Sequence, residues 1–470
     1  MLEATGRALK VRLAKEQSES RLPALAAAIV REGRCVFLGS AGEVDGAPPS
    51  VETQFRCGSI TKTFVAVEVM RLRDEGAVDL DAPITAYLGE LGALSCSVAQ
   101  LLSHTSGLRA ETSGLWWERT TGGDFAQLIA SSLRPEDVVL APGRRFHYSN
   151  VGYAVLGELI SRLRGAPWDD VISEELLAPL GMLRTSTRPV RPFAHGFGVH
   201  PHADLLLAEP AHDAGAMAPA GQLWTTAEDL TRWAALLAGR RSDLLSAETA
   251  AEMRLPLAVN DVDGEPWTTA HGLGLQLFND GGRRSYGHGG SMPGFLAMLR
   301  LEQESGDGVV VVTNATSGMS PDFDKDLLRI VHEHQPRPPA PWHPLPGGLE
   351  PRLLEITGTW YWGTRGFVLS FDRQRRLTLR ALGAGREGTF EQTGEDSFVG
   401  LSGYYEGETL RAVRQADGSL SHIDIGSFVL TRASYDESAP VPGGVDASGW
   451  QGSAEEERRH HRLGHPRRRE

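Results

Sequence analysis

The chain has 470 residues, of which 41% are hydrophobic and 23% charged, and its formal net charge is −13 at pH 7. This length and these ordinary proportions favour a globular protein with more than one domain. The acidic balance argues against nucleic acid and the membrane surface as partners, because both bind basic faces. Three cysteines, Cys35, Cys57 and Cys96, are too few for a disulfide framework.

The first twenty residues have the pattern of a charged amphipathic helix and lack the apolar stretch of a secretory signal. No run reaches the roughly 18 apolar residues that a membrane span needs. We therefore expect a cytoplasmic protein. No motif implies a cofactor, and the chain has no glycine-rich phosphate loop ending in lysine.

The first part of the chain predicts strands followed by helices. Residues 22–48 indicate a strand pair, and residues 59–76 a helix with apolar periodicity. Helical patterns then dominate residues 97–240. The last of these helices starts with Thr226 three residues before Asp229, a variant of the capping box.

The strand pattern returns in residues 293–316, and a helix is predicted at 321–334. Strands at both ends of a helical region favour an antiparallel sheet whose strands come from both ends of one domain. The predicted fold class is therefore α+β, with helices flanking the sheet and an additional all-helical subdomain.

The chain is predicted to divide into a main domain at 1–335, a linker at 336–351, a small domain at 352–433 and a tail at 434–470. The linker contains seven prolines. The small domain shows short strands separated by turns, which predicts an antiparallel β-barrel. The tail looks disordered, and its histidines and arginines carry no functional signal.

Ser59 lies where the first predicted helix begins. A helix start presents free backbone N–H groups and the positive end of the helix dipole, which suits a developing oxyanion. Lys62, three residues on, lies on the same face and is one of only four lysines beside 43 arginines. Lysine can act as a base when its pKa falls, whereas arginine effectively cannot.

Two further segments contain polar residues at expected structural boundaries. Tyr148-Ser149-Asn150 precedes a helix, and His288-Gly289-Gly290 lies beside the second strand pair. With Ser59-x-x-Lys62, these segments resemble the three motifs of the penicillin-recognising serine hydrolases, in the class C β-lactamase and DD-peptidase branch. The flanking segments at 101–108 and 218–233 are typical of that family as well. The resemblance covers about residues 20–335.

The resemblance implies that Ser59 is the nucleophile that becomes acylated and that Lys62 helps to take its proton. It implies that Tyr148 acts with Lys62 as general base and later activates water. The oxyanion hole would consist of the backbone N–H groups of Ser59 and Ser291.

The resemblance also implies substrate-binding residues. Asn150 would form a hydrogen bond with the substrate amide or with Lys62. His288 would line the pocket at a position where many relatives have lysine. Gly289 and Gly290 would let the substrate backbone approach the strand closely. No metal is implied.

Simpler interpretations exist for several of these residues. Tyr148 alone is usually a packing residue, Asn150 could be a helix N-cap, and residues 288–290 could form a plain turn. We interpret Ser103, His104 and Ser106 as a helix-end turn that supports the site rather than as a serine–histidine pair.

Other hydrolase chemistries lack their motifs. His200 and His202 do not match the spacing of a zinc hydrolase. A nucleophile elbow has the pattern Gly-x-Ser-x-Gly. The nearest match starts at Gly289 and contains Ser291, but Pro293 stands where the second glycine is required.

The expected reaction is acyl transfer through a serine ester, on small esters or amides, in an esterase, D-aminopeptidase or DD-peptidase. The alternatives are an acyltransferase or peptide cyclase and a non-catalytic penicillin-binding sensor. Partners would be small molecules or peptides, and the oligomeric state stays open. The small domain resembles the lipocalin-like domains of some D-aminopeptidases, where it would either limit access to the site or only add stability.

Overall fold

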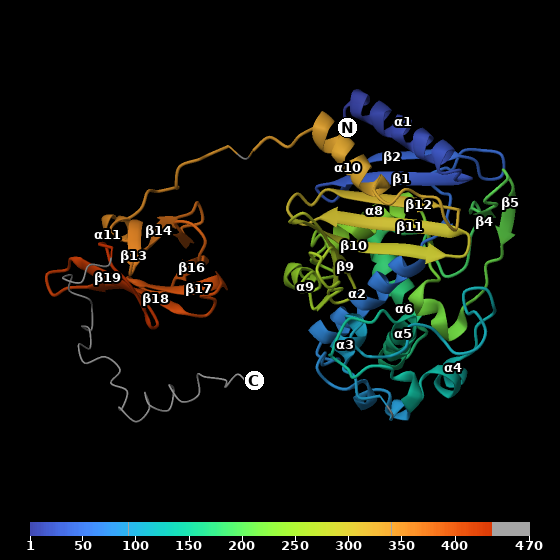
Figure 1. Cartoon of the computed structure of the whole chain (residues 1–470), viewed down its shortest axis with the longest axis horizontal. Coiled ribbons are helices and arrows are strands. Elements are labelled where there is room, and N and C mark those ends of the chain that lie inside the picture. Colours follow the sequence, from blue (N-terminus) through green and yellow to red (C-terminus); the bar gives the residue numbers. More distant parts are fainter. Residues whose placement is uncertain (93, 340, 435–470) are drawn as a thin grey trace, which may run out of the picture. The chain divides into compact units, whose positions relative to one another are not determined.

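The computed structural model describes residues 1–92, 94–339 and 341–434. The chain forms two compact units, the first spanning Met1–Arg337 and the second beginning at Pro338 (Figure 1). The division falls within the segment expected as a linker. Residues 435–470, where a disordered tail is expected, lie outside the described residues.

The first unit is built on an eight-stranded antiparallel sheet in the order β2-β1-β12-β11-β10-β9-β8-β7. The pairing of β1 with β12 joins segments from both ends of the unit, which confirms the predicted α+β architecture. The short strands β7, β8 and β9 were not predicted. The strands are β1 (Ala24–Arg31), β2 (Arg34–Gly42), β7 (Ala258–Val259), β8 (Thr269–His271), β9 (Gln276–Asp280), β10 (Arg283–Met292), β11 (Phe295–Glu302) and β12 (Gly308–Thr313).

Helices cover both faces of this sheet, and β1 shows why its sequence is apolar throughout. Its even-numbered residues from Ala24 to Val30 join the core that contains α2 and α8, and its odd-numbered residues from Leu25 to Ile29 join the core beneath α1 and α10. Side chains alternate across a strand, so a strand covered on both faces needs an unbroken apolar run. These helices are α1 (Glu3–Glu19), α2 (Thr61–Asp74), α8 (Ala227–Leu237) and α10 (Phe323–His334).

The part of the chain between β2 and β7 is largely helical, as predicted. Its longest helix, α5 (Asn150–Arg164), packs against α2 and ends at Gly165, whose φ of 71° suits glycine. The smaller helices are η1 (Gly58–Ile60), η2 (Ile84–Ala86), η3 (Gly89–Leu91), α3 (Val98–Leu102), α4 (Phe125–Ser132), η4 (Pro135–Asp137), α6 (Trp168–Ile172), η5 (Ser173–Leu177), α7 (Ala178–Leu180), η6 (Gly215–Ala220) and α9 (Ala247–Glu252). Two small antiparallel pairs join β3 (Phe55–Arg56) to β6 (Trp224–Thr225) and β4 (Gly196–Val199) to β5 (Leu206–Glu209).

The second unit is an antiparallel barrel, as predicted, and its eight strands follow chain order. Backbone hydrogen bonds between Tyr361 and Thr431, of 2.8 and 2.9 Å, join its first and last strands. Buried side chains such as Trp360, Phe390 and Phe398 fill the interior. The elements are α11 (Pro351–Leu354), β13 (Gly358–Trp362), β14 (Arg365–Phe371), β15 (Leu377–Ala381), β16 (Gly388–Gln392), β17 (Ser397–Gly403), β18 (Thr409–Arg414), β19 (Leu420–Ile425) and β20 (Phe428–Leu430).

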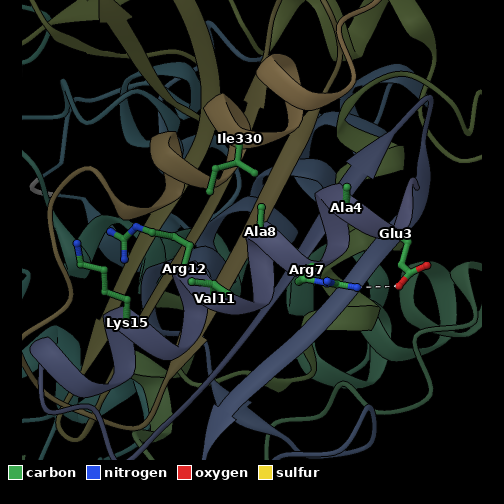
Figure 2. A pocket seen from close by; sticks show the side chains of 8 residues that line it. All are labelled: Glu3, Ala4, Arg7, Ala8, Val11, Arg12, Lys15 and Ile330. Carbon is green, nitrogen blue, oxygen red and sulfur yellow. Dashed lines mark hydrogen bonds and ion pairs between the residues drawn. The ribbon is translucent and has the colours of Figure 1, made fainter.

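A surface groove runs along α1 beside α10 and is lined by Glu3, Ala4, Arg7, Ala8, Val11, Arg12, Lys15 and Ile330 (Figure 2). None of these residues belongs to the motifs identified in the sequence. Among the described residues, no helix has both the length and the apolar character required to cross a bilayer.

Candidate active site

Ser59 lies in the short helix η1, which connects the two-residue strand β3 to α2. Its predecessor Gly58 has a φ of 56°, and a Cβ there would lie 2.5 Å from the backbone nitrogen of Ser291. Only glycine permits both this conformation and this close approach. The turn therefore holds Ser59 at the start of α2, directly beside strand β10.

Lys62 is completely buried, and its amine lies against the Ser59 side chain. The distance from Lys62 Nζ to Ser59 Oγ is 3.0 Å, and Nζ also donates a hydrogen bond of 2.6 Å to the carbonyl of Ala220. Burial lowers the pKa of Lys62 to about 7, although the negative charges of Glu111 and Glu118 act in the opposite direction. The amine is therefore partly neutral near pH 7, and a neutral amine can accept a proton.

Other lysines of the chain have different surroundings. Lys325 is partly exposed and pairs with Asp280 at 2.7 Å and Asp322 at 3.0 Å, while Lys15 is exposed beside Glu19. Exposed pairs of this kind contribute little to stability. Lys62 thus differs from these lysines through its position in the fold.

Tyr148 borders the same amine. Lys62 Nζ lies 5.0 Å from the centre of the Tyr148 ring. Burial raises the pKa of Tyr148, and a side-chain interaction with Ser59 only partly opposes this shift. The phenol therefore carries its proton at neutral pH, and it can donate or relay a proton more readily than it can act as a phenolate base.

His104 holds the segment that carries Tyr148. Its Nδ1 accepts a hydrogen bond of 3.1 Å from the Ser149 N–H, and its carbonyl accepts one of 2.8 Å from the His147 N–H. Its ring stacks on Tyr148 with ring centres 4.1 Å apart. The preceding Ser103 is the C-cap of α3, which confirms a helix-end turn that supports the site.

Asn150 is the first residue of α5, and the cap of that helix is Ser149, whose side chain accepts the Gly152 N–H at 3.0 Å. The N-cap interpretation of Asn150 is therefore wrong. Asn150 Nδ2 donates a hydrogen bond of 2.7 Å to Glu111 Oε1. The hydrogen bonds of the Lys62 amine go instead to the Ser59 hydroxyl and the Ala220 carbonyl. Glu111, which lies far from the motifs in sequence, was not predicted as a site residue.

Strand β10 carries His288, Gly289 and Gly290, so these residues do not form a turn. A Cβ at Gly290 would lie 2.0 Å from the Cys57 carbonyl oxygen, whereas one at Gly289 would make only ordinary contacts. Gly290 is thus required by the close approach of the Ser59 turn, in addition to any approach of a substrate. The arrangement brings the Ser59 and Ser291 backbones together at one place.

Three buried histidines, His104, His271 and His288, form a cluster in which one ring nitrogen of each lies within 4.8 Å of the others. Both ring nitrogens of His271 lack a hydrogen-bond partner among the residues that the structure describes. Burial, reinforced by the positive charge of Lys62, lowers the pKa of His271 to about 4 and that of His288 to about 3. These imidazoles are neutral at pH 7. His271 was not predicted, because no motif surrounds it.

The cluster does not fit a metal centre well. His104 Nδ1 already accepts the Ser149 N–H, so in the neutral ring its other nitrogen carries the proton and has no free lone pair. His288 Nδ1 lies 2.5 Å from the Gly289 carbonyl, which leaves only Nε2 as an acceptor. Two available nitrogens are fewer than the three protein ligands of typical catalytic zinc sites. His200 and His202 lie between β4 and β5, outside this cluster.

Comparison with known proteins relates both units to protein families. The beta-lactamase family profile matches residues 11–333, and a domain of unknown function matches residues 349–432. Penicillin-binding protein 4 of Amycolatopsis lactamdurans is 28% identical over 334 residues, covering 67% of this chain and 86% of that protein. The D-aminopeptidase of Brucella ovis is 25% identical over 433 residues, covering 85% of this chain and 74% of that protein.

The fold is shared with a solved structure, the octameric penicillin-binding protein homologue from Pyrococcus abyssi. The two chains superpose with a TM-score of 0.61 at 22% identity, over 91% of this chain and all of the other. The family profile covers more than half of the 470 residues and includes every motif discussed above. The chain therefore belongs to the beta-lactamase family, in the group of penicillin-binding-protein-like serine hydrolases.

Proposed function

We propose that this protein is a serine hydrolase that cleaves small esters or amides, with Ser59 forming the covalent acyl-enzyme. One observation carries the proposal: a buried Lys62 amine, with its pKa lowered to about 7, lies 3.0 Å from the Ser59 hydroxyl. A partly neutral amine can accept the proton that the hydroxyl loses when it attacks a carbonyl.

In acylation, the Ser59 oxygen bonds to the substrate carbonyl carbon while its proton passes to Lys62. We assign the backbone N–H groups of Ser59 and Ser291 to the negative charge that develops on the carbonyl oxygen. The Tyr148 phenol gives its proton to the departing amine or alcohol and regains one from Lys62. Water then attacks the serine ester by the same route, which releases the acid and restores the Ser59 hydroxyl.

The charges around the site favour substrates with an amine over substrates with a carboxylate. His288 is neutral where a lysine would attract a carboxylate, and Glu111 and Glu118 are the charged groups that act on Lys62. We therefore place small amides and esters with a free amino group, such as those of D-amino acids, ahead of β-lactams. The similarity to a D-aminopeptidase supports this order.

A fluorescent fluorophosphonate tests the covalent step, because it labels an activated serine. The wild-type protein should be labelled and the Ser59→Ala variant should not, and equal labelling of both would overturn the proposal. The anilides of D-alanine and N-acetyl-D-alanine, together with a chromogenic cephalosporin, then test the substrate class. Hydrolysis of the free-amine anilide should be fastest, and faster hydrolysis of the cephalosporin would contradict the proposed class.

A further inference from the structure

The two ends of the C-terminal barrel differ. At one end α11 closes the barrel: Leu353 and Ile356 are buried, and Arg352 and Arg414 form ion pairs with Asp396. At the opposite end the turns β13–β14, β15–β16, β17–β18 and β19–β20 come together, because consecutive strands of an up-and-down barrel alternate in direction. No helix of the described barrel covers this end, which we call the barrel mouth.

The barrel mouth contains a cavity of about 140 Å³ lined by aromatic and aliphatic side chains together with Arg365 and Arg386. Its aromatic walls include Trp362, Tyr405 and Phe428. No acidic residue lines it. An apolar cavity with two cationic side chains and no acid is the arrangement that suits an anion with an apolar body.

The Arg386 guanidinium lies against two aromatic rings. Its guanidinium carbon lies 3.8 Å from the centre of the Tyr404 ring and 4.8 Å from that of Phe428. Stacking occupies the faces of the guanidinium and leaves its edge N–H groups for polar partners. One such partner is the Tyr405 hydroxyl, and the remaining edge N–H groups suit a planar acceptor such as a carboxylate. Neither Arg386 nor Arg365 forms an ion pair within the described part of the chain, although many other arginines of the protein do.

The mouth also exposes large apolar side chains. Trp362 is 45% exposed and Tyr404 58% exposed, while the barrel interior beneath them is filled. The side chains buried below the mouth are aliphatic and aromatic, and the proposed ligand site is the small cavity at the mouth itself. Clustered exposed aromatic residues around a small cavity are typical of a recognition site.

We propose that the barrel mouth binds a small monocarboxylate that carries one aromatic ring or a short branched chain. The carboxylate pairs with the edge of Arg386, assisted by Arg365, and the apolar part packs against Trp362 and Phe428. The hydrolysis proposed above releases amino acids, whose ammonium group two arginines would repel, so the ligand is not the product of that reaction. The site itself does not depend on that reaction, since none of its residues belongs to the first unit.

Binding is measured on the full-length protein carrying Ser59→Ala, which keeps the test independent of turnover. The probes are phenylacetate, its neutral analogue phenylacetamide, and acetate. Their binding is measured by isothermal titration calorimetry and by saturation-transfer NMR. Phenylacetate should bind at least about tenfold more tightly than the other two, because phenylacetamide lacks the charge-assisted hydrogen bonds and acetate lacks the ring packing. Absence of phenylacetate binding, or equal binding of phenylacetamide, would overturn the proposal.

Variants locate the site. Arg386→Gln should weaken phenylacetate binding about tenfold or more, and Arg386→Lys, which keeps the charge but loses the planar stack, should give an intermediate loss. Arg373→Gln, in the β14–β15 turn at the opposite end, is the matched control and should leave binding unchanged. Melting temperatures of the variants check folding. Unchanged binding to Arg386→Gln would place the ligand elsewhere, such as at the Ser59 site, and refute the proposal.

Discussion

Lysine and histidine side chains are buried in the first unit, whereas the buried side chains of the described barrel are aliphatic or aromatic. Lys62, His104, His271 and His288 are all nearly or completely buried, but the barrel interior contains aliphatic and aromatic side chains with the Tyr405 hydroxyl at its edge. Both units are built from antiparallel strands. The difference is therefore in what the strands enclose: burial in the first unit lowers the pKa of Lys62 to about 7, where proton transfer at neutral pH is possible, and keeps His271 and His288 neutral.

Removing the base should produce the largest effect. Lys62→Arg keeps a positive charge but provides no amine that can lose its proton, so kcat/KM should fall by roughly a thousandfold or more. Fluorophosphonate labelling should fall in parallel. Lys325→Arg, at an exposed ion pair, is the matched control and should keep full activity. Near-normal activity of Lys62→Arg would contradict the assignment of Lys62 as base.

A cavity created in the core of the barrel should lower its stability and leave catalysis unchanged. Phe390 is completely buried, and Phe390→Ala should lower the unfolding free energy of the barrel by about 3–5 kcal/mol. Calorimetry should show this as a shift of one unfolding transition. Because the proposed catalytic residues lie in the first unit, esterase activity below that transition should change little. A parallel loss of activity would show that the barrel takes part in catalysis.

The pH dependence of the reaction follows from the lowered pKa of Lys62. Activity requires the neutral amine, so kcat/KM should rise with pH up to about 7 and fall about tenfold for each pH unit below it. At pH 5 the loss would be about a hundredfold. The buried histidines lose their protons at lower pH, so a limb near pH 4 would instead point to His271 or His288.

Substitution of His104 separates its two contacts with the tyrosine segment. His104→Phe keeps a ring to stack on Tyr148 but leaves the buried Ser149 N–H without an acceptor, and kcat should fall roughly tenfold with little change in KM. His104→Asn places an oxygen near the Nδ1 position and suits the φ of 58° at this residue, so it should recover part of the activity. If both variants lose activity equally, the hydrogen bond to Ser149 is not what positions Tyr148.

Glu111 should give the smallest and most selective effect. Glu111→Gln removes a negative charge beside Asn150 but keeps an oxygen that can accept its amide hydrogen bond. We expect KM to rise about tenfold for an amide substrate with a free amino group and to stay unchanged for its N-acetylated analogue. Equal changes for both substrates would mean that Glu111 acts only by positioning Asn150.

Local rules were sufficient for the main helices, for the longer strands and for the motif residues, but not for the short strands β7, β8 and β9. The strand pair predicted at 22–48 corresponds to β1 and β2, Thr226 caps α8 as its spacing predicted, and turns separate the barrel strands as predicted. The spacing of Ser59 and Lys62 placed both side chains on one helix face, and they are in contact. Each of these features depends on residues close together in the sequence.

Other features depend on residues that only the fold brings together. The contact of His104 with Tyr148, the pairing of Asn150 with Glu111, and the position of His271 on an unpredicted short strand join segments separated by tens of residues or more. The lowered pKa of Lys62 belongs to this group as well, because desolvation sums the exclusion of water by every surrounding element. The sequence by itself determined which amine lies next to the serine; the tertiary structure decided that this amine is buried and that its pKa falls to about 7, because only the surrounding elements exclude water from it.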